Sequence, residues 1–139
     1  MIVVDGLSVE YGPVRAVRDV SLEIRDGEVL AILGRNGAGK TTTMKALAGI
    51  LPAANGRLLD RDTDITSLDT DGRVGRGLVL VPEGRGMFAD LSVRENLLMG
   101  AYARRKTSRA LREDLDRVTE PFPRLRERMG QRSGSLSGG

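Results

Sequence analysis

Apolar and polar positions alternate over short distances in the first part of the chain. Three partly alternating runs, at residues 2–4, 7–11 and 16–24, are separated by glycine-containing turns and predict β-strands. A continuous apolar run at residues 29–33 predicts a buried strand, and the Asp26-Gly27 pair before it is typical of a tight hairpin turn. We therefore expect a β-rich layer that leads into a buried strand.

The pattern becomes helical after residue 40. Residues 41–48 predict a helix, and a turn at residues 55–56 introduces a short strand at residues 57–59. A polar stretch rich in Asp and Thr then covers residues 60–76. The next apolar run, at residues 78–81, predicts a second buried strand.

The second half of the chain has mainly helical patterns. Ser92 and Glu95 have the spacing of a capping box and open a predicted helix that runs to about Tyr102. Ser108 is expected to cap another helix, and residues 124–129 predict a further helical turn. The apolar face of the helix after Ser108 consists of Leu111, Leu115, Val118 and Phe122. This order of elements predicts an α/β domain with a helical insertion.

Composition narrows the class of protein. The 139 residues include no cysteine, which excludes disulfides and thiolate metal sites, and no histidine, which removes the commonest general base. The apolar runs are much shorter than the ~20 residues that span a bilayer, and the amino terminus lacks a signal-peptide pattern. A reducing cytosol is therefore the default expectation.

Basic residues are concentrated between positions 104 and 132, where ten Arg or Lys side chains stand beside five acids. Such a stretch can bind nucleic acid or an anionic membrane surface. The pattern favours a solvated helix face with mixed ion pairs. Because the stretch lacks an interleaved aromatic series that would stack on bases, nucleic acid is not an expected partner.

Residues 34–41 fit the phosphate-binding pattern G-x-x-x-x-G-K-[ST] at every fixed position. Its glycines allow backbone N–H groups to turn toward phosphates, and the helix that follows adds the positive end of its dipole. Lys40 would bring a positive charge to the β- and γ-phosphates, and the Thr41 hydroxyl would bind Mg²⁺. A chance match in a glycine-rich turn is the alternative, and the predicted strand and helix on either side argue against it.

Four further features stand in a fixed order around this loop. They are Tyr11-Gly12, the run at residues 20–24 followed by Gly27-Glu28, the run at residues 81–85, and the closing Leu136-Ser137-Gly138-Gly139. With the phosphate loop, they resemble the ATP-binding subunit of ABC transporters over the whole chain. The resemblance implies a P-loop NTPase core of the ABC ATPase type, with an N-terminal antiparallel β layer and a helical insertion.

The resemblance also implies roles for individual residues. Tyr11 would stack on adenine, Glu83 of the Q-loop would reach Mg²⁺ and the attacking water, and Thr41 would bind the metal. The phosphates of ATP would be held by Gly34, Arg35, Asn36, Gly37, Ala38, Gly39, Lys40, Thr41 and Thr42. The ATP of a partner subunit would meet the signature residues Ser137, Gly138 and Gly139.

The same resemblance implies a domain order and a set of partners. We expect a β layer and phosphate-loop core at residues 1–82, a Q-loop region at 83–91, a helical subdomain at 92–135 and the start of the signature at 136–139. The expected partners are a second ABC ATPase subunit, which makes a homo- or heterodimer, integral membrane permease subunits and, indirectly, a substrate-binding protein. The expected location is peripheral, at the cytoplasmic face of the inner or plasma membrane.

The subtype can be narrowed by the residues of the Q-loop. Pro82-Glu83-Gly84-Arg85, together with the run at residues 122–128, resembles the LivF-type ATPase of branched-chain amino acid importers. The ATPase of a related amide or urea importer shares much of this pattern. A non-hydrolytic nucleotide-binding or regulatory module remains an alternative, as does a soluble ABC ATPase of translation or DNA repair.

The family's Walker B strand, with its acidic pair, and its switch histidine have no counterpart within the 139 residues. Phosphoryl transfer depends on positioning and electrostatic stabilisation, so their loss should remove most activity. We therefore expect an incomplete domain that ends inside the LSGGQ signature. It would have no catalytic residue of its own beyond Glu83, and this chain alone would hydrolyse ATP poorly.

Overall fold

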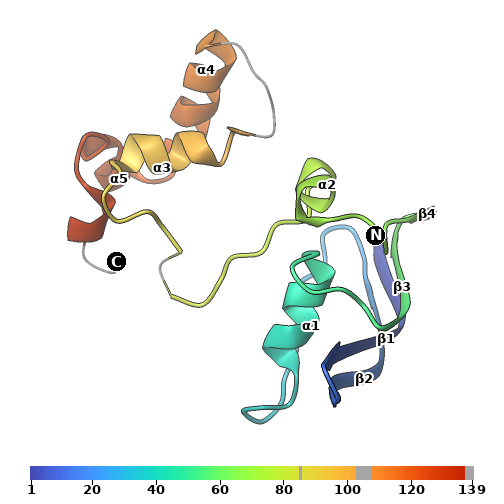
Figure 1. Cartoon of the computed structure of the whole chain (residues 1–139). Coiled ribbons are helices and arrows are strands. Elements are labelled where there is room, and N and C mark those ends of the chain that lie inside the picture. Colours follow the sequence, from blue (N-terminus) through green and yellow to red (C-terminus); the bar gives the residue numbers. More distant parts are fainter. Residues whose placement is uncertain (85, 103–107, 137–139) are drawn as a thin grey trace. The chain divides into compact units, whose positions relative to one another are not determined.

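The computed structural model describes residues 1–84, 86–102 and 108–136. The chain forms two compact units, Met1–Leu80 and Val81–Gly139 (Figure 1). No helix among the described residues is both long and apolar enough to cross a membrane.

The first unit is built on a four-stranded antiparallel sheet with the order β2-β1-β3-β4. The strands are β1 (Ile2–Tyr11), β2 (Val14–Ile24), β3 (Asn55–Asp60) and β4 (Thr63–Asp64). Val4 pairs with Leu22 on one side and with Leu58 on the other, so apolar residues of three strands share one face. The predicted β layer is confirmed, although its first two runs form one continuous strand.

Helix α1 (Lys40–Leu47) packs against this sheet and closes the core of the first unit (Figure 1). Ala46 and Leu47 of α1 are buried in the same cluster as Val4 and Leu58. Ile65, after β4, is fully buried there. The helix predicted after the phosphate loop is therefore present, and Gly49 follows it with a φ of +76°, the conformation that favours glycine at a helix end.

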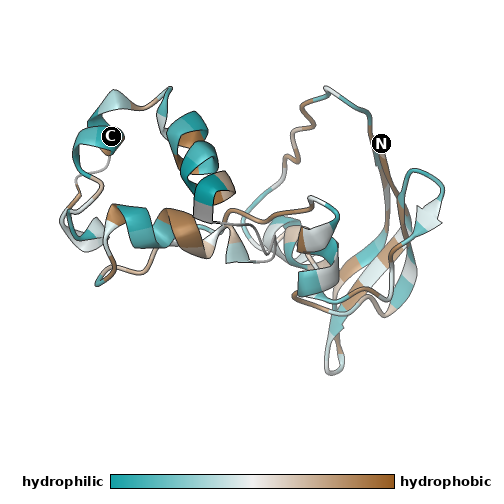
Figure 2. Cartoon of the chain, turned by 90° about the horizontal axis from the view of Figure 1, so that it is seen from above, coloured by the Kyte–Doolittle hydropathy of each residue, from teal (hydrophilic) through white to brown (hydrophobic). Residues whose placement is uncertain are grey.

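The apolar runs at residues 29–33 and 78–81 do not form the predicted buried strands. Val29 is 95% exposed, Leu33 is 89% exposed, and both runs are drawn as coil, coloured apolar in Figure 2. A strand needs a hydrogen-bonded neighbour, and the sheet of the described residues includes neither run. The turn at Asp26-Gly27 forms, with the amide of Glu28 donating to the Arg25 carbonyl at 3.1 Å, but no hairpin follows it.

The polar stretch at residues 60–76 contains structure that its pattern did not indicate. Besides the short β4, it forms helix α2 (Thr70–Gly75), whose amino end is capped by the Asp69 carboxylate accepting from the Gly72 amide at 2.9 Å. The turn predicted at residues 55–56 is instead the start of β3. There Gly56 has a φ of +95°, and a Cβ at this position would lie 2.6 Å from backbone atoms of β1.

The second unit contains helices α3 (Val93–Met99), α4 (Ser108–Thr119) and α5 (Pro123–Glu127) and a 3₁₀ turn at Ser133–Ser135. The predicted capping box is confirmed, because the Ser92 amide donates to Glu95 Oε2 at 2.8 Å and the Glu95 amide donates to Ser92 Oγ at 3.2 Å. α3 ends at Met99, earlier than predicted. The cap expected from the Ser108 side chain lies outside the described part of the chain.

Candidate functional site

The loop before α1 is shaped by a turn and by two glycines. The Ala38 amide donates to the Arg35 carbonyl at 3.1 Å, and Gly37 has a φ of +82°. Gly39, at the N-cap of α1, has a φ of +91°, and a Cβ there would lie only 2.7 Å from the Ala16 carbonyl oxygen of β2. This position therefore requires glycine both for its backbone conformation and for the close approach to β2.

The amino end of α1 has the properties of an anion site. No side chain caps it, and no acidic residue lies in its first turn, so the positive end of the helix dipole is not neutralised locally. Thr43 is buried and turned inward, with its amide at 2.8 Å and its hydroxyl at 3.0 Å from the Gly39 carbonyl oxygen. Thr41 is exposed at the same end of the helix. Of these two hydroxyls, that of Thr41 is therefore the one placed to meet a ligand.

Lys40 places its amino group over the loop. Its Nζ donates to the Gly34 carbonyl at 2.7 Å and to the Arg35 carbonyl at 2.9 Å. These two bonds hold the positive charge at the mouth of the loop, next to the open helix end. The structure thus brings the predicted lysine, the loop backbone and the helix amino end together.

Tyr11 lies at the turn end of the β1–β2 hairpin, where it pairs with Val14, and the residue is 47% exposed. Two residues further along, β2 reaches Ala16, which contacts the loop at Gly39. The hairpin that carries Tyr11 therefore also borders the phosphate loop. An exposed aromatic ring at this position is available for stacking on a base.

The other predicted site residues belong to the second unit. Glu83 is exposed, and Ser137, Gly138 and Gly139 lie outside the described residues. No cluster of three or more Asp, Glu, His or Cys side chains able to hold a metal occurs in the described part of the chain. The pairing of Thr41 with Glu83 at Mg²⁺ therefore stays a prediction.

Sequence reasoning did not single out two polar residues that the structure makes prominent. Arg73 of α2 is buried against the carboxyl end of α1, and Asn96 of α3 joins two segments of the second unit. Asn96 is the fourth residue after the capping Ser92, and this spacing is the only signal that could have drawn attention to it. Nothing in the sequence distinguishes Arg73 from the surface arginines.

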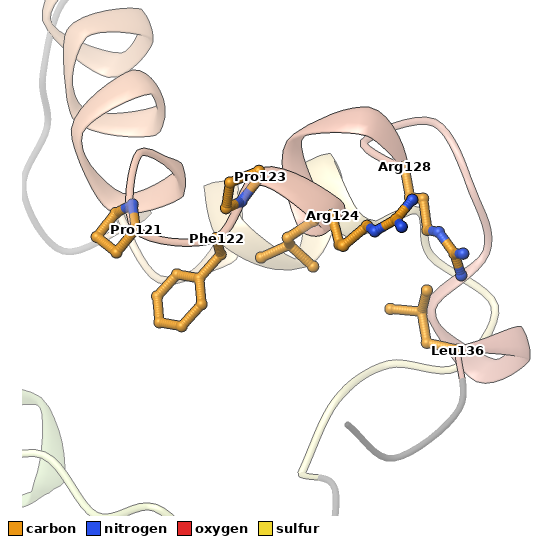
Figure 3. A pocket seen from close by; sticks show the side chains of 7 residues that line it. Pro121, Phe122, Pro123, Arg124, Arg128 and Leu136 are labelled. Carbon is orange, nitrogen blue, oxygen red and sulfur yellow. The ribbon is translucent and has the colours of Figure 1, made fainter.

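The second unit also contains an open pocket of about 650 Å³ near the carboxyl end of the described chain (Figure 3). Its lining consists of Pro121, Phe122, Pro123, Arg124, Leu125, Arg128 and Leu136. None of the residues predicted to hold the chain's own ATP lines this pocket. The candidate site is therefore the loop of the first unit.

A glycine-rich turn that closes on an open helix end, with a lysine folded over it, is the arrangement of a P-loop nucleotide-binding protein. The chain belongs to the ABC transporter family, because the family model described as ABC transporter matches residues 17–139.

Relatives and solved structures agree with this family. The chain is 39% identical over 139 residues to the high-affinity branched-chain amino acid transport ATP-binding protein BraG of Pseudomonas aeruginosa, covering 100% of this chain and 59% of that protein. It is 40% identical over 136 residues to the lipopolysaccharide export system ATP-binding protein LptB of Escherichia coli, covering 96% of this chain and 55% of that protein. The chain thus spans little more than half the length of these relatives.

The fold is shared with a solved ATP-binding subunit of an ABC transporter. The two structures superpose with a TM-score of 0.79 at 24% identity, covering 99% of this chain and 56% of the other. The expected ABC ATPase fold is therefore confirmed for the matched part.

Proposed function

We propose that this chain binds ATP with Mg²⁺ at residues 34–42 and supplies the nucleotide-binding part of an ABC importer ATPase. The observation that carries the proposal is the position of Lys40, whose Nζ lies 2.7 Å from the Gly34 carbonyl oxygen at an uncapped helix end. An anion there would meet one full positive charge and the backbone N–H groups of the first helical turn.

The residues present fit a nucleoside triphosphate. The Lys40 amino group would exchange its two loop carbonyls for the β- and γ-phosphate oxygens, and the N–H groups of residues 37–42 would donate to the same phosphates. Thr41 would hold Mg²⁺, which neutralises phosphate charge when bound, and Glu83 would add a carboxylate oxygen or orient water. Tyr11 would stack on the adenine.

Hydrolysis in this proposal requires a dimer. Each ATP would be bound by the phosphate loop of one subunit and by Ser137, Gly138 and Gly139 of the other. The dimer would drive integral membrane permease subunits from the cytoplasmic face of the membrane and serve a substrate-binding protein indirectly. In the 139 residues alone, Glu83 is the only acid proposed near the reacting phosphate, so we expect binding with little turnover.

The proposed cargo is a branched-chain amino acid. The motif Pro82-Glu83-Gly84-Arg85 and the 39% identity to BraG support it. The 40% identity to LptB shows that overall identity alone does not separate import from export. A test is to replace the matching part of BraG, and separately of LptB, with this chain. The proposal requires restored leucine uptake in the first hybrid, and restored lipopolysaccharide export by the second alone would contradict it.

Nucleotide binding is tested by titrating the chain with Mg-ATP and following hydrolysis in the same samples. Lys40→Ala should weaken binding about 10- to 100-fold, the factor expected for a charged hydrogen bond. Tyr11→Ala should weaken it about 5- to 100-fold through lost stacking. Lys45→Ala is the matched control, because Lys45 is exposed in the last turn of the same helix.

Four outcomes would contradict parts of this proposal. The absence of saturable binding, or equal effects of the Lys40 and Lys45 variants, would contradict the phosphate-loop assignment. Tripolyphosphate has no base, so Tyr11→Ala should leave its binding unchanged. Weaker tripolyphosphate binding in this variant would contradict the stacking role. Robust Mg²⁺-dependent turnover abolished by Lys40→Ala would support the site and overturn the expectation of an inactive chain.

A further inference from the structure

Two segments of the second unit that are far apart in sequence run together at the start of α3. The Ser133 amide donates to the Leu91 carbonyl and the Gly134 amide to the Ala89 carbonyl, both at 2.9 Å. On the other side of the contact, the Val93 amide donates to the Gln131 carbonyl at 3.0 Å. Residues 88–93, which follow the proposed Q-loop, are thus joined to residues 129–134, which lead toward the signature.

The side chain of Asn96 lies at the centre of this contact. Its Oδ1 accepts from the Phe88 amide at 2.8 Å, which fixes the orientation of the side-chain amide. Its Nδ2 lies 3.0 Å from the Phe88 and Ser92 carbonyl oxygens and 3.4 Å from that of Leu91. These contacts close the turn at residues 88–92 upon the first turn of α3.

The same Nδ2 also reaches the second segment. It lies 2.9 Å from Ser133 Oγ, and Ser133 is only 2% exposed. Gly134 is held equally closely, because a Cβ there would lie 3.0 Å from Ala89. A buried hydroxyl and a close backbone contact leave little room for residues 133–134 to move independently of residues 88–92.

We infer that Asn96 is a positioning residue that holds the approach to the signature in fixed register with the segment after Glu83. It closes the turn whose Ala89 and Leu91 carbonyls accept the amides of residues 133–134, and it bonds Ser133 directly. A displacement that begins at the Q-loop segment would therefore be carried to the signature. This consequence rests on the proposed function, in which the signature meets the ATP of a partner, whereas the coupling itself does not.

Two substitutions and a control separate the bonds that Asn96 makes within its own turn from the bond that it makes to Ser133. Asn96→Asp keeps an acceptor for the Phe88 amide but places a carboxylate oxygen against the carbonyls of Phe88, Leu91 and Ser92, so it removes the donor that closes the turn, whereas the Ser133 hydroxyl can still donate to the carboxylate. Ser133→Ala removes only the side-chain bond to the second segment. Gln131→Ala is the matched control, because it removes another local side-chain bond, from Nε2 to Ser135 Oγ at 2.9 Å, without touching Asn96.

The experiment is hydrogen exchange of single backbone amides by NMR, with Mg-ATP affinity measured on the same samples. Asn96→Asp should speed exchange of the Ser133 and Gly134 amides about fivefold or more, the factor that one lost hydrogen bond corresponds to. Ser133→Ala should in turn speed exchange at Phe88, and Gln131→Ala should change neither. ATP affinity should stay the same in all three variants.

The inference would be overturned if Asn96→Asp left the exchange of the Ser133 and Gly134 amides unchanged, or if Ser133→Ala left that of the Phe88 amide unchanged. Asn96 would then cap only its own turn. An equal effect of the Gln131 variant at Phe88 would overturn it too. If Asn96→Asp unfolds the unit, the exchange at Phe88 in Ser133→Ala decides. A failure of the unsubstituted chain to bind ATP would contradict the proposed function and leave the coupling measurement intact.

Discussion

Replacement of Arg73 should destabilise the first unit more than replacement of any exposed arginine. Arg73 is 4% exposed, and its guanidinium is surrounded by carbonyl oxygens. Nη1 donates to Ala46 and, at 2.9 Å, to Leu47, which are at the end of α1. Nε donates to Leu68 at 2.9 Å, and Nη2 donates to Thr66 at 2.8 Å. One side chain thus joins α1, α2 and the loop between β4 and α2.

The expected loss in the free energy of unfolding follows from these bonds. Burial lowers the pKa of Arg73, but a guanidinium remains charged at neutral pH, so its desolvation is offset by four carbonyl dipoles. Arg73→Met keeps most of the apolar stem and leaves buried carbonyls without a donor, at about 1–3 kcal/mol each where water cannot replace it. We expect a loss of about 3–5 kcal/mol, within the range for breaking a buried charged contact. Arg73→Lys, which keeps the charge but loses the planar fork, should cost about 1–3 kcal/mol.

The assay is urea unfolding monitored by tyrosine fluorescence in a Tyr102→Phe background, so that Tyr11 alone reports on the first unit. Arg57→Met is the control, because Arg57 is 64% exposed and pairs with Asp5 at 3.0 Å on the surface of the same unit. It should change the free energy of unfolding by less than about 1 kcal/mol. Equal effects of the Arg57 and Arg73 variants, at unchanged denaturant dependence, would refute the reasoning.

Three further outcomes are expected. Gly39→Ala should weaken Mg-ATP binding about tenfold or more, because its Cβ would lie 2.7 Å from a β2 carbonyl oxygen; Gly75→Ala, which meets nothing within 4 Å, is the control in the same titration. Hydrogen bonds from Ser92 hold the pKa of Glu95 below its ordinary value, so Glu95 stabilises the fold above about pH 4.3 and this contribution is lost as pH falls further. Glu95→Gln should therefore lower the thermal midpoint at pH 7 and have a smaller effect at pH 3; an equal effect at both would exclude the ionised form as the cause. Ile65→Ala, at a fully buried position, should cost about 2–5 kcal/mol in urea unfolding, and a cost below 1 kcal/mol would contradict its place in the core.

Signals confined to a few residues predicted structure well. The capping box of Ser92 and Glu95 and the helix after the phosphate loop depend on contacts within one or two turns, and both are present. The phosphate loop could be predicted for the same reason, because Lys40 donates to the Gly34 and Arg35 carbonyls of the loop in which it lies. Local sequence determines such features because the interacting groups are neighbours in the chain.

Features that depend on distant partners could not be predicted in this way. The run at residues 29–33 indicates a preference for burial but not whether a partner strand exists, and the described residues provide none. Arg73 is buried only because two separate segments, the end of α1 and residues 66–68, turn carbonyls toward it, and no pattern around residue 73 shows this. Helix α2 is six residues long, too short for a clear period, and its one local signal was the capping Asp69.

These outcomes change which element is expected to position a nucleotide. The sequence pattern predicted a buried strand at residues 29–33 that leads into the loop, yet the loop takes its shape without this strand, because Gly39 packs against β2 and Lys40 bonds to the loop itself. The β1–β2 hairpin carries Tyr11 at its turn and borders the loop at Ala16. Both proposed contacts to ATP, at the base and at the phosphates, therefore depend on one hairpin whose strands are held by backbone hydrogen bonds. A change that shifts β2 by one residue should consequently disturb both contacts together, whereas a change in residues 29–33 should leave the distance between them unaltered.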